Sequence, residues 1–331
     1  MATRQSGMHV VVTGAAGFIG SHTCERLIAA GHRVTGVDAF DGYLYPADIK
    51  RATAAELARL PGVRLVEADI CDRAAIAGVL DDTVDVVCHL AALAGVRPSL
   101  AEPLRYLRTN IEGTGVIVER MRAAGLHRLV FASSSSVYGI VPGDTRQVAA
   151  FREDDPCLHP ASPYAATKRM NELQLSTYRD LFGLGVYALR FFTVYGPRQR
   201  PDMAIARFTR AIARGEPLTL FGDGSSRRDY TFIDDIVSGV VAAIAAVTPG
   251  SYEIVNLGGT HTISLAELVE LIERTVGKPA VIDRQPSQPG DVPVTYASID
   301  RARHLLGYEP TTRPDAGIAR YWAWAAPRLR A

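Results

Sequence analysis

The chain has 331 residues and a formal net charge of +1 at pH 7, because 36 Lys and Arg residues stand against 35 Asp and Glu residues. Charges of both signs are mixed along the sequence, so nothing points to nucleic acid or an anionic membrane surface as a partner. The length is sufficient for two lobes with a sizeable core.

The cysteines and the first residues bear on the compartment. The four cysteines have neither metal-ligand nor disulfide-framework spacing, so the sequence predicts no metal site and a reducing environment. The first apolar strand is expected at about His9, which leaves no room for a signal peptide, and no apolar run approaches the roughly 20 residues of a spanning helix. A cytoplasmic protein is therefore expected.

A glycine-rich turn follows the first predicted strand, His9 to Thr13. It reads Gly14-Ala-Ala-Gly17-Phe-Ile-Gly20 and leads into a helix expected from Ser21 to Ala30. Glycines at this spacing permit a tight turn and a close approach of the backbone to a pyrophosphate, which a helix N-terminus attracts. The residues expected to contact a dinucleotide here are Gly14, Gly17, Phe18, Ile19 and Gly20.

The second predicted strand, Arg33 to Val37, ends at Asp38, 18 residues beyond Gly20. A carboxylate there is placed to accept hydrogen bonds from the adenosine ribose and to repel a 2′-phosphate, which favours NAD over NADP. The alternative is a glycine-rich turn without a ligand. The preceding strand, the following helix and the acid together make that alternative the weaker one.

The third and fourth predicted strands also end in residues suited to a cofactor. The strand Val63 to Ala68 is followed by Asp69 and Ile70, which could meet an adenine edge. The strand Val84 to Leu90 runs into small residues that let a ligand approach the backbone. The contacts expected from these two strands are Asp69, Ile70, Leu90, Ala91 and Ala92.

The fifth predicted strand, Leu129 to Ala132, follows a helix of about 20 residues expected from Pro103 to Ala124. Nearly continuous apolar strands that alternate with helices predict an α/β fold, a Rossmann-type doubly wound parallel sheet. Ligands of such sheets bind beyond the carboxyl ends of the strands.

A serine run, Ser133-Ser-Ser-Ser136-Val-Tyr138-Gly139, stands at that end of the fifth strand. Composition alone would favour a flexible polar loop. Tyr164-Ala-Ala-Thr-Lys168 follows, and side chains four residues apart project from one face of a helix, so the ammonium can lie near the phenol. A neighbouring cation favours phenolate and makes the hydroxyl a usable base.

A surface Tyr and Lys on an amphipathic helix is the alternative for such a pair. Two observations weigh against it: the chain contains only three lysines, and the pair follows both a nucleotide signature and the serine run. With Tyr164 and Lys168 in place, a serine hydroxyl that hydrogen-bonds a reacting sugar oxygen becomes the better interpretation of the run.

The second half begins with a predicted strand, Val186 to Phe192, and a helix from Met203 to Arg214. A strand and turn at 217–224 precede Arg227 and Arg228, which suit a diphosphate because guanidinium binds phosphate bidentately; solvated surface charge is the alternative.

Further elements are expected as a helix at 234–246, a strand at 252–257 and a helix at 264–275 that opens with a capping box of Ser264 and Glu267. The tail after Pro279 is Pro-rich and then helical. We expect residues 8–192 with about 234–258 to form a dinucleotide domain. We expect a smaller, discontinuous C-terminal substrate domain to be formed by residues of about 193–233 together with 259–331.

Almost the whole chain resembles the extended short-chain dehydrogenase/reductase family. The spacing of Gly14, Gly17 and Gly20, the serine run and the Tyr164/Lys168 pair match its cofactor and catalytic motifs. Within the family the chain is most similar to bacterial UDP-glucuronate 4-epimerases. The stretches that carry this similarity are 38–46 with Lys50-Arg51, 89–97, 190–203, 221–230 and 288–292.

The resemblance implies an NAD-dependent isomerase that converts UDP-glucuronate to UDP-galacturonate through a transient 4-keto intermediate and recycles its NAD. It implies that Tyr164 is the base, that Ser134 assists by a hydrogen bond, and that Lys168 partners the tyrosine and holds the nicotinamide ribose. A homodimer packed through the 103–124 helix and the Tyr-Lys helix is implied as well.

The resemblance also implies the substrate contacts. Thr193 stands where galactose-type epimerases have Asn, and with Arg200 and the serines 133–136 it is expected to bind the C6 carboxylate. Phe221 and Arg228 match contacts to uracil and diphosphate, and Asp291 matches a contact to the uridine ribose. The full expected set is Arg97, Ser134, Ser135, Ser136, Thr193, Arg200, Phe221, Arg228 and Asp291.

Three alternatives remain. A UDP-glucose/UDP-galactose 4-epimerase is the nearest. A decarboxylase or dehydratase of this family typically carries an acid before Val-Tyr-Gly, where Ser135 and Ser136 are neutral. An NAD-binding protein without catalysis is the last, because a fold does not guarantee a function.

Overall fold

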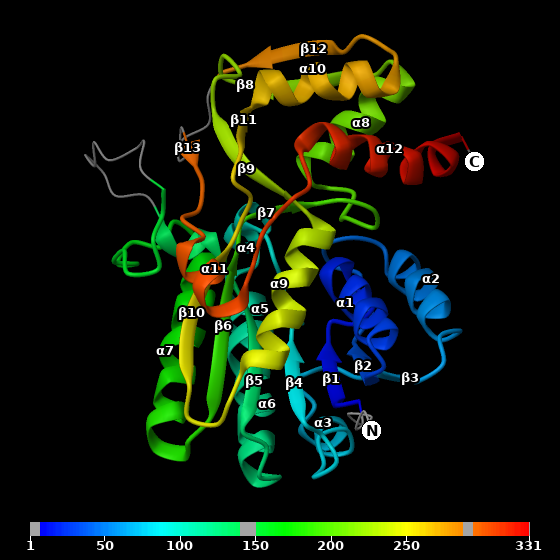
Figure 1. The fold of residues 1–331 in the computed structure, drawn as a ribbon. Helices are drawn as coiled ribbons and strands as arrows, with labels where there is room; N and C mark the ends of the chain where they lie inside the picture. The colour runs from blue at the N-terminus through cyan, green and yellow to red at the C-terminus, as the bar shows by residue number, and fades with distance from the viewer. Residues whose placement is uncertain (1–6, 140–149, 287–293, 331) are drawn as a thin grey trace, which may run out of the picture.

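The structure, a computed structural model, describes residues 7–139, 150–286 and 294–330. Its largest element is a seven-stranded sheet in which all neighbouring strands are parallel, as the sequence predicts for a doubly wound α/β fold (Figure 1). In spatial order the strands are β3 (Val63–Glu67), β2 (Arg33–Asp38), β1 (His9–Thr13), β4 (Val86–His89), β5 (Arg128–Ser134), β6 (Gly185–Phe191) and β10 (Tyr252–Leu257).

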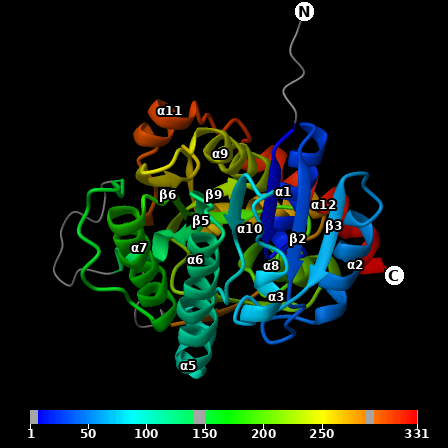
Figure 2. The same ribbon diagram turned by 90° about the horizontal axis from the view of Figure 1, so that it is seen from below.

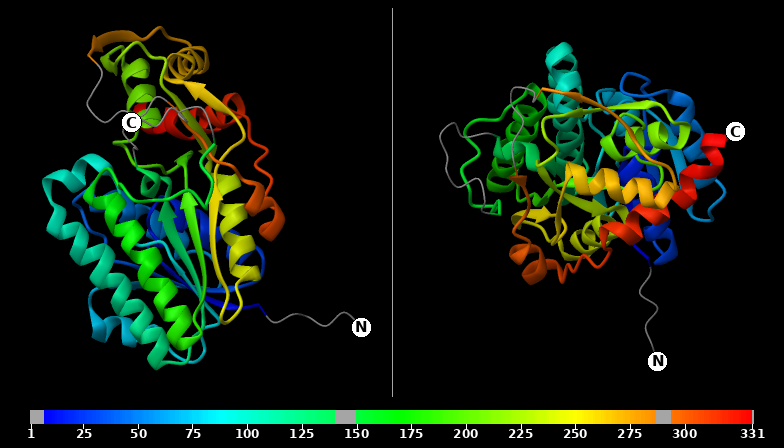
Figure 3. Two further views of the ribbon diagram at one scale, coloured as in Figure 1. Left: turned by 90° about the vertical axis from the view of Figure 1, so that its left-hand side faces the viewer. Right: turned by 90° about the horizontal axis from the view of Figure 1, so that it is seen from above.

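The sheet is covered by helices on both faces, which is why β1 and β6 are buried at every residue. The helices α6 (Gly113–Ala123) and α7 (Pro163–Phe182) lie on one face, and α1 (Phe18–Ala29) packs with α9 (Ile233–Ala246) on the other (Figure 3). Two further helices, α2 (Ala47–Leu57) against α1 and α3 (Arg73–Ala77) against α6, were not predicted from the sequence. No helix among the described residues is long and apolar enough to cross a membrane.

The helix α1 begins at Phe18, three residues before the predicted start at Ser21, so that boundary was wrong. Gly17 is the N-cap residue and Gly20 lies inside the first turn. A Cβ at Gly20 would overlap the carbonyl oxygen of Gly14, so only glycine lets the helix pack this closely on the turn.

The predicted helix from Pro103 to Ala124 is not one regular α-helix. It consists of α5 (Pro103–Tyr106), a π-helical turn η1 (Leu107–Glu112) and α6. π turns of this kind occur frequently at functional sites.

Two small sheets with α8 (Ala204–Arg214), α10 (Leu265–Val276) and α12 (Pro314–Arg330) form what we call the small lobe, which lies above the large sheet in Figure 1. One sheet contains β7 (Thr193–Tyr195), β9 (Arg227–Phe232), β11 (Thr262–Ser264) and β13 (Val294–Thr295); the other pairs β8 (Pro217–Phe221) with β12 (Val281–Gln285). The predicted capping box of α10 is confirmed: Ser264 accepts from the Glu267 N–H, and Glu267 accepts from the Ser264 N–H.

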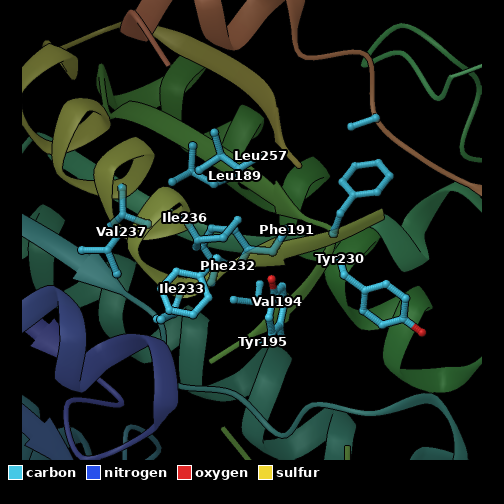
Figure 4. Packing of buried hydrophobic residues seen from close by; sticks show 14 of the residues in the cluster. Leu189, Phe191, Val194, Tyr195, Tyr230, Phe232, Ile233, Ile236, Val237 and Leu257 are labelled. Atoms are coloured by element: carbon cyan, nitrogen blue, oxygen red, sulfur yellow. The ribbon is translucent and has the colours of Figure 1, made fainter. Parts of the chain in front are cut away.

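A single buried apolar cluster joins the small lobe to the large sheet (Figure 4). Phe191 comes from the end of β6, Val194 from β7, Phe232 from β9 and Ile236 from α9, and all are buried. Each such side chain contributes about 1.5–3 kcal/mol on burial. The shared core therefore fixes the small lobe over the carboxyl ends of the strands.

Candidate active site

A cavity of about 420 Å³ lies beyond the carboxyl ends of the central strands, between the large sheet and the small lobe. All the residues expected to contact the cofactor line it. They are Gly14, Gly17, Phe18, Ile19, Gly20, Asp38, Asp69, Ile70, Leu90, Ala91, Ala92, Tyr164 and Lys168. The same cavity is lined by five of the expected substrate contacts, namely Ser134, Ser135, Ser136, Thr193 and Arg200.

The cofactor end of this cavity is built at backbone level. Gly14 has a φ of +72°, and a Cβ there would come within 2.9 Å of the Ala91 nitrogen. Gly17 is the N-cap residue of α1 and has no side chain, so no side chain caps the first N–H groups of this helix. Gly17 and Phe18 line the cavity at this helix end. Such a helix end favours an anion, and these residues therefore fit the pyrophosphate of NAD.

Asp38 stands at the end of β2 on the same side of the cavity. One carboxylate oxygen accepts from the Ala16 N–H at 3.0 Å and the other accepts from the Phe40 N–H at 2.9 Å. Both contacts orient the carboxylate, and each oxygen keeps a further lone pair for a ribose hydroxyl. The arrangement fits the adenosine ribose of NAD.

The serine run is not a flexible loop. Strand β5 continues through Ser134, and Ser135–Tyr138 form a 3₁₀ turn (η2) in which the Ser136 N–H donates to Ser134 Oγ at 3.2 Å. The Ser133 hydroxyl donates to Glu172 at 2.7 Å, and Ser133 also lines the cavity. Its expected part in binding a carboxylate stays a prediction.

Tyr164 and Lys168 lie on α7 and are both buried. The Lys168 ammonium donates to the Ala132 carbonyl of β5 at 2.6 Å and lies 4.8 Å from the centre of the Phe131 ring. Burial lowers the pKa of Lys168 to about 7, against the opposing charge of Glu172.

Burial also raises the pKa of Tyr164, while a hydrogen bond with Ser134 and the charge of Arg200 act to lower it. The sequence predicted that the Lys168 ammonium lowers the pKa of Tyr164. In the structure Ser134 and Arg200 act in that direction, the Lys168 ammonium donates to the Ala132 carbonyl, and the net shift of the Tyr164 pKa is upward.

Asn110, which the sequence did not single out, joins three parts of the site from the π turn η1. Its amide oxygen accepts from the Leu93 N–H at 2.9 Å, and its amide nitrogen donates to the Leu93 carbonyl and to Thr167 Oγ1, both at 3.0 Å. Thr167 lies between Tyr164 and Lys168. Asn110 thus ties the loop after β4 to the catalytic helix, and no sequence signal announced the π turn that permits it.

His89 extends this network toward the glycine turn. Burial lowers its pKa to about 3, so the ring is neutral. Thr13 Oγ1 lies 2.6 Å from His89 Nδ1 and accepts from the Ala91 N–H, while His89 Nε2 lies 3.1 Å from Thr114 Oγ1. The chain of contacts fixes the backbone that the cofactor would meet at Ala91.

The sugar end of the cavity is built from side chains. The Arg200 guanidinium donates to the Ala94 carbonyl at 2.9 Å and, through two nitrogens, to the Asp202 carboxylate at 2.6 and 3.0 Å. Thr193 opens β7 at the same end. A short loop between β2 and α2 also reaches this wall with Leu44 and Tyr45, which sequence reasoning missed.

Three expected substrate contacts lie outside the cavity lining. The Arg97 guanidinium lies 5.5 Å from the centre of the Phe221 ring, so these two predicted residues meet each other. Arg228, on β9, donates to the Arg227 carbonyl at 2.9 Å. Asp291 lies outside the described residues. Their roles stay predictions.

Residues 10–258 match the NAD dependent epimerase/dehydratase family. The chain is 40% identical over 323 residues to the UDP-glucuronate 4-epimerase of Thermodesulfobacterium geofontis, covering 97% of each protein. It is also similar to the solved UDP-glucuronic acid 4-epimerase of Bacillus cereus in complex with UDP-glucuronic acid and NAD, with a TM-score of 0.89, 36% identity and coverage of 97% and 100%. The solved UDP-glucose 4-epimerase of Thermotoga maritima with UDP-glucose has a TM-score of 0.86, 30% identity and coverage of 97% and 100%.

Proposed function

Because this chain belongs to the NAD-dependent epimerase/dehydratase family, we propose that it is an isomerase that converts UDP-glucuronate to UDP-galacturonate. The observation that carries the proposal is the single cavity. It is lined by the glycine turn and also by Tyr164, Thr193 and Arg200. A base beside a dinucleotide site and a cation beside the sugar are what C4 inversion of a uronate requires.

The residues at the cofactor end would hold NAD, which when bound supplies the acceptor and then the donor of a hydride. The N-terminus of α1 at Gly17 and Phe18 would hold the pyrophosphate. Asp38 would accept from the adenosine ribose, and Lys168 would hold the nicotinamide ribose.

Tyr164 takes the proton from the sugar 4-hydroxyl as the hydride leaves C4, and Ser134 holds the same oxygen by a hydrogen bond. The 4-keto sugar then turns in the cavity and presents its other face. Tyr164 returns the proton as the hydride comes back to C4, so the reaction has no net oxidation and NAD is recycled.

Arg200 and Thr193 act on the C6 carboxylate. A 4-keto uronate is a β-keto acid and loses CO₂ when the bond to its carboxylate aligns with the carbonyl π system. The Arg200 guanidinium is fixed by its hydrogen bonds to Asp202 and to the Ala94 carbonyl. A donor fixed in this way would hold the substrate carboxylate out of that alignment.

The decisive experiment is incubation of the purified protein with UDP-glucuronate and no added NAD. We expect UDP-galacturonate as the main product, resolved by chromatography from UDP-pentose and unreacted substrate. Faster turnover of UDP-glucose than of UDP-glucuronate would instead support a UDP-glucose 4-epimerase, and UDP-pentose as the main product would support a decarboxylase.

The carboxylate assignment is tested by Arg200→Ala. We expect a KM for UDP-glucuronate raised by about tenfold or more and an increased UDP-pentose fraction, since a charge-assisted contact is worth about 1.5–3 kcal/mol. Arg207→Ala, an exposed change on α8, is the control and should leave both unchanged. An unaltered product distribution and KM in Arg200→Ala would show that other residues bind the carboxylate.

The homodimer implied by the resemblance is part of the same proposal. Figure 2 shows α6 and α7 side by side on the side of the molecule away from α2. On these and the adjoining helices several apolar side chains are exposed, namely Leu100, Leu104, Leu107, Met170 and Leu173. A second copy of the chain would cover them.

The dimer is tested by Leu104→Glu, which places a charge at a 77% exposed leucine of α5. We expect the mass from light scattering to fall from dimer to monomer. Leu158→Glu is the matched control, because Leu158 is 73% exposed but lies outside these helices. A monomeric wild-type protein would contradict this part of the proposal.

A further inference from the structure

Arg198 has an unusual backbone conformation close to the sugar end of the cavity. Its φ is +65°, and among the described residues only one other non-glycine residue, Phe40, has a positive φ. This conformation costs an L-residue with a side chain about 1–2 kcal/mol. Contacts elsewhere must hold it in place.

Those contacts come from the side chain of Arg198 to α1. Two nitrogens of its guanidinium donate to the Glu25 carboxylate, at 2.8 and 2.5 Å. One of these nitrogens also donates to His22 Nδ1 at 3.0 Å. Burial lowers the pKa of His22, so the ring is neutral, and its Nε2–H donates to the Pro197 carbonyl at 2.9 Å. Arg198 is 13% exposed, which limits screening of the pair by water.

The turn held in this way leads directly to Arg200. The Gln199 N–H donates to the Gly196 carbonyl at 3.1 Å and closes the turn, and the chain then places Arg200 against the Ala94 carbonyl. At Gly196 a Cβ would come within 2.5 Å of the Ile233 side chain, so this position cannot carry a side chain that would anchor the turn. The turn is therefore held on α1 by the Arg198 side chain, which contacts Glu25 and His22, together with the His22 hydrogen bond to the Pro197 carbonyl.

We infer that Arg198 is a positioning residue that fixes the 196–199 turn on α1 and thereby sets where the Arg200 guanidinium meets the substrate carboxylate. The inference rests on the proposed function. It also connects the two ends of the cavity, because α1 is the helix whose N-terminus lines the cofactor end.

The consequence of loosening this anchor is a change in product. If Arg200 moves, the carboxylate of the 4-keto sugar can rotate into alignment with the carbonyl. The C5–C6 bond then breaks, its electron pair moves to C5 and the 4-oxygen as an enolate, and CO₂ leaves. C5 takes a proton from solvent, and return of the hydride to C4 gives a UDP-pentose.

The test compares Arg198→Ala with Arg198→Gly, because glycine adopts a φ of +65° without strain. If the side-chain anchor matters, both variants raise the KM for UDP-glucuronate and the UDP-pentose fraction by about tenfold, the scale expected for a small misplacement of a positioned group. If Arg198→Gly behaves as wild type, the backbone conformation alone is sufficient and the inference is wrong.

Glu25→Gln provides an independent variant, since Glu25 is 39% exposed and its loss threatens folding less. We expect Glu25→Gln to raise the KM for UDP-glucuronate and the UDP-pentose fraction, but by less than Arg198→Ala. Arg198→Lys should have a product ratio between those of Arg198→Ala and the wild type. Arg303→Ala on α11 (Asp300–Leu306) removes an exposed ion pair with Glu309; it is the control and should change neither the KM nor the product ratio.

Bound NAD per protomer is measured in every variant and should stay at the wild-type level. Loss of NAD together with loss of activity would mean a general loosening of α1 and would overturn the inference. A wild-type protein that makes no UDP-galacturonate refutes the proposed function. Unchanged ratios in both Arg198 variants and in Glu25→Gln, with an active wild type, refute only the positioning role.

Discussion

The cofactor end and the sugar end of the cavity differ in what holds their walls. At the cofactor end the walls are the carboxyl ends of parallel strands β1 to β4, and the close approaches, of Gly14 to Ala91 and of Gly20 to Gly14, are between backbones. At the sugar end the walls come from distant parts of the chain. Side-chain contacts, such as that of Arg200 with the Ala94 carbonyl and that of Arg198 with Glu25, hold them.

Because of this difference, a substitution is expected to have different consequences at the two ends of the cavity. A backbone contact admits no side chain, so the cofactor end either keeps its glycines or fails to form. A side-chain pair can be exchanged while the fold survives, so the sugar end can change its substrate without loss of NAD. The predictions below test this contrast.

The largest effect is expected at Tyr164, which lies between the two ends. Tyr164→Phe removes the proton acceptor and should lower kcat by about 10² to 10⁴, with NAD content and KM little changed. Tyr106→Phe is the matched control, because Tyr106 packs edge-on against Tyr164 and donates only to the Ala94 carbonyl. Comparable kcat losses in both variants, measured by product chromatography, would contradict the assignment of Tyr164 as base.

The next largest effect is expected for Gly20→Ala at the cofactor end. A Cβ there would overlap the Gly14 carbonyl, so α1 must shift from the turn, at a cost of about 3 kcal/mol. The purified variant should contain little NAD and should melt at a lower temperature. Gly78→Ala, where a Cβ would meet only ordinary contacts, should behave as wild type. Full NAD content in Gly20→Ala would contradict the backbone account of this end.

An effect of similar size, but dependent on pH, is expected for Lys168→Met. Burial lowers the pKa of Lys168 from 10.5 to about 7, so between these values the unfolded chain binds more protons than the folded one, and stability rises with pH. The buried ammonium therefore destabilises the fold in full below pH 7 and no longer does so above 10.5. The variant should gain about 2–4 kcal/mol in free energy of unfolding at pH 6.

Urea unfolding at pH 6 and at pH 10 measures this gain, which should shrink toward the higher pH. The control is Lys278→Met, because Lys278 also donates to a backbone carbonyl, that of Ala213, but is exposed. An equal gain at both pH values would show that the ammonium is not the cause. The kcat of Lys168→Met should fall as well.

The smallest effect is expected for Phe221→Ala in the small lobe. If Phe221 stacks on the uracil, its loss should raise the KM for UDP-glucuronate about tenfold, with NAD content unchanged. Ile282→Ala on the paired strand β12 controls for damage to the two-stranded sheet. Equal KM values for both variants would remove Phe221 from the substrate contacts.

The sequence predicted local features more accurately than long-range ones. Strand β1 was predicted at its exact bounds, because a β-branched run followed by glycine is a local signal. The strands β7 and β9 were missed, since both pair only with segments far away in the chain, and β7 has only three residues. The π turn was missed because apolar periodicity does not reveal it; the partners of Asn110 in this turn, Leu93 and Thr167, lie 17 and 57 residues away.

The sequence by itself determined the parallel sheet, the glycine turn and the Tyr164/Lys168 pair, since each depends on spacing along a few residues. Only the tertiary structure decided which groups act on those residues. In the folded chain the Lys168 ammonium donates to the Ala132 carbonyl, the Ser133 hydroxyl donates to Glu172, and the charge of Arg200 acts on Tyr164. Charges act through space, and neighbours in space come from segments that the order of residues does not identify.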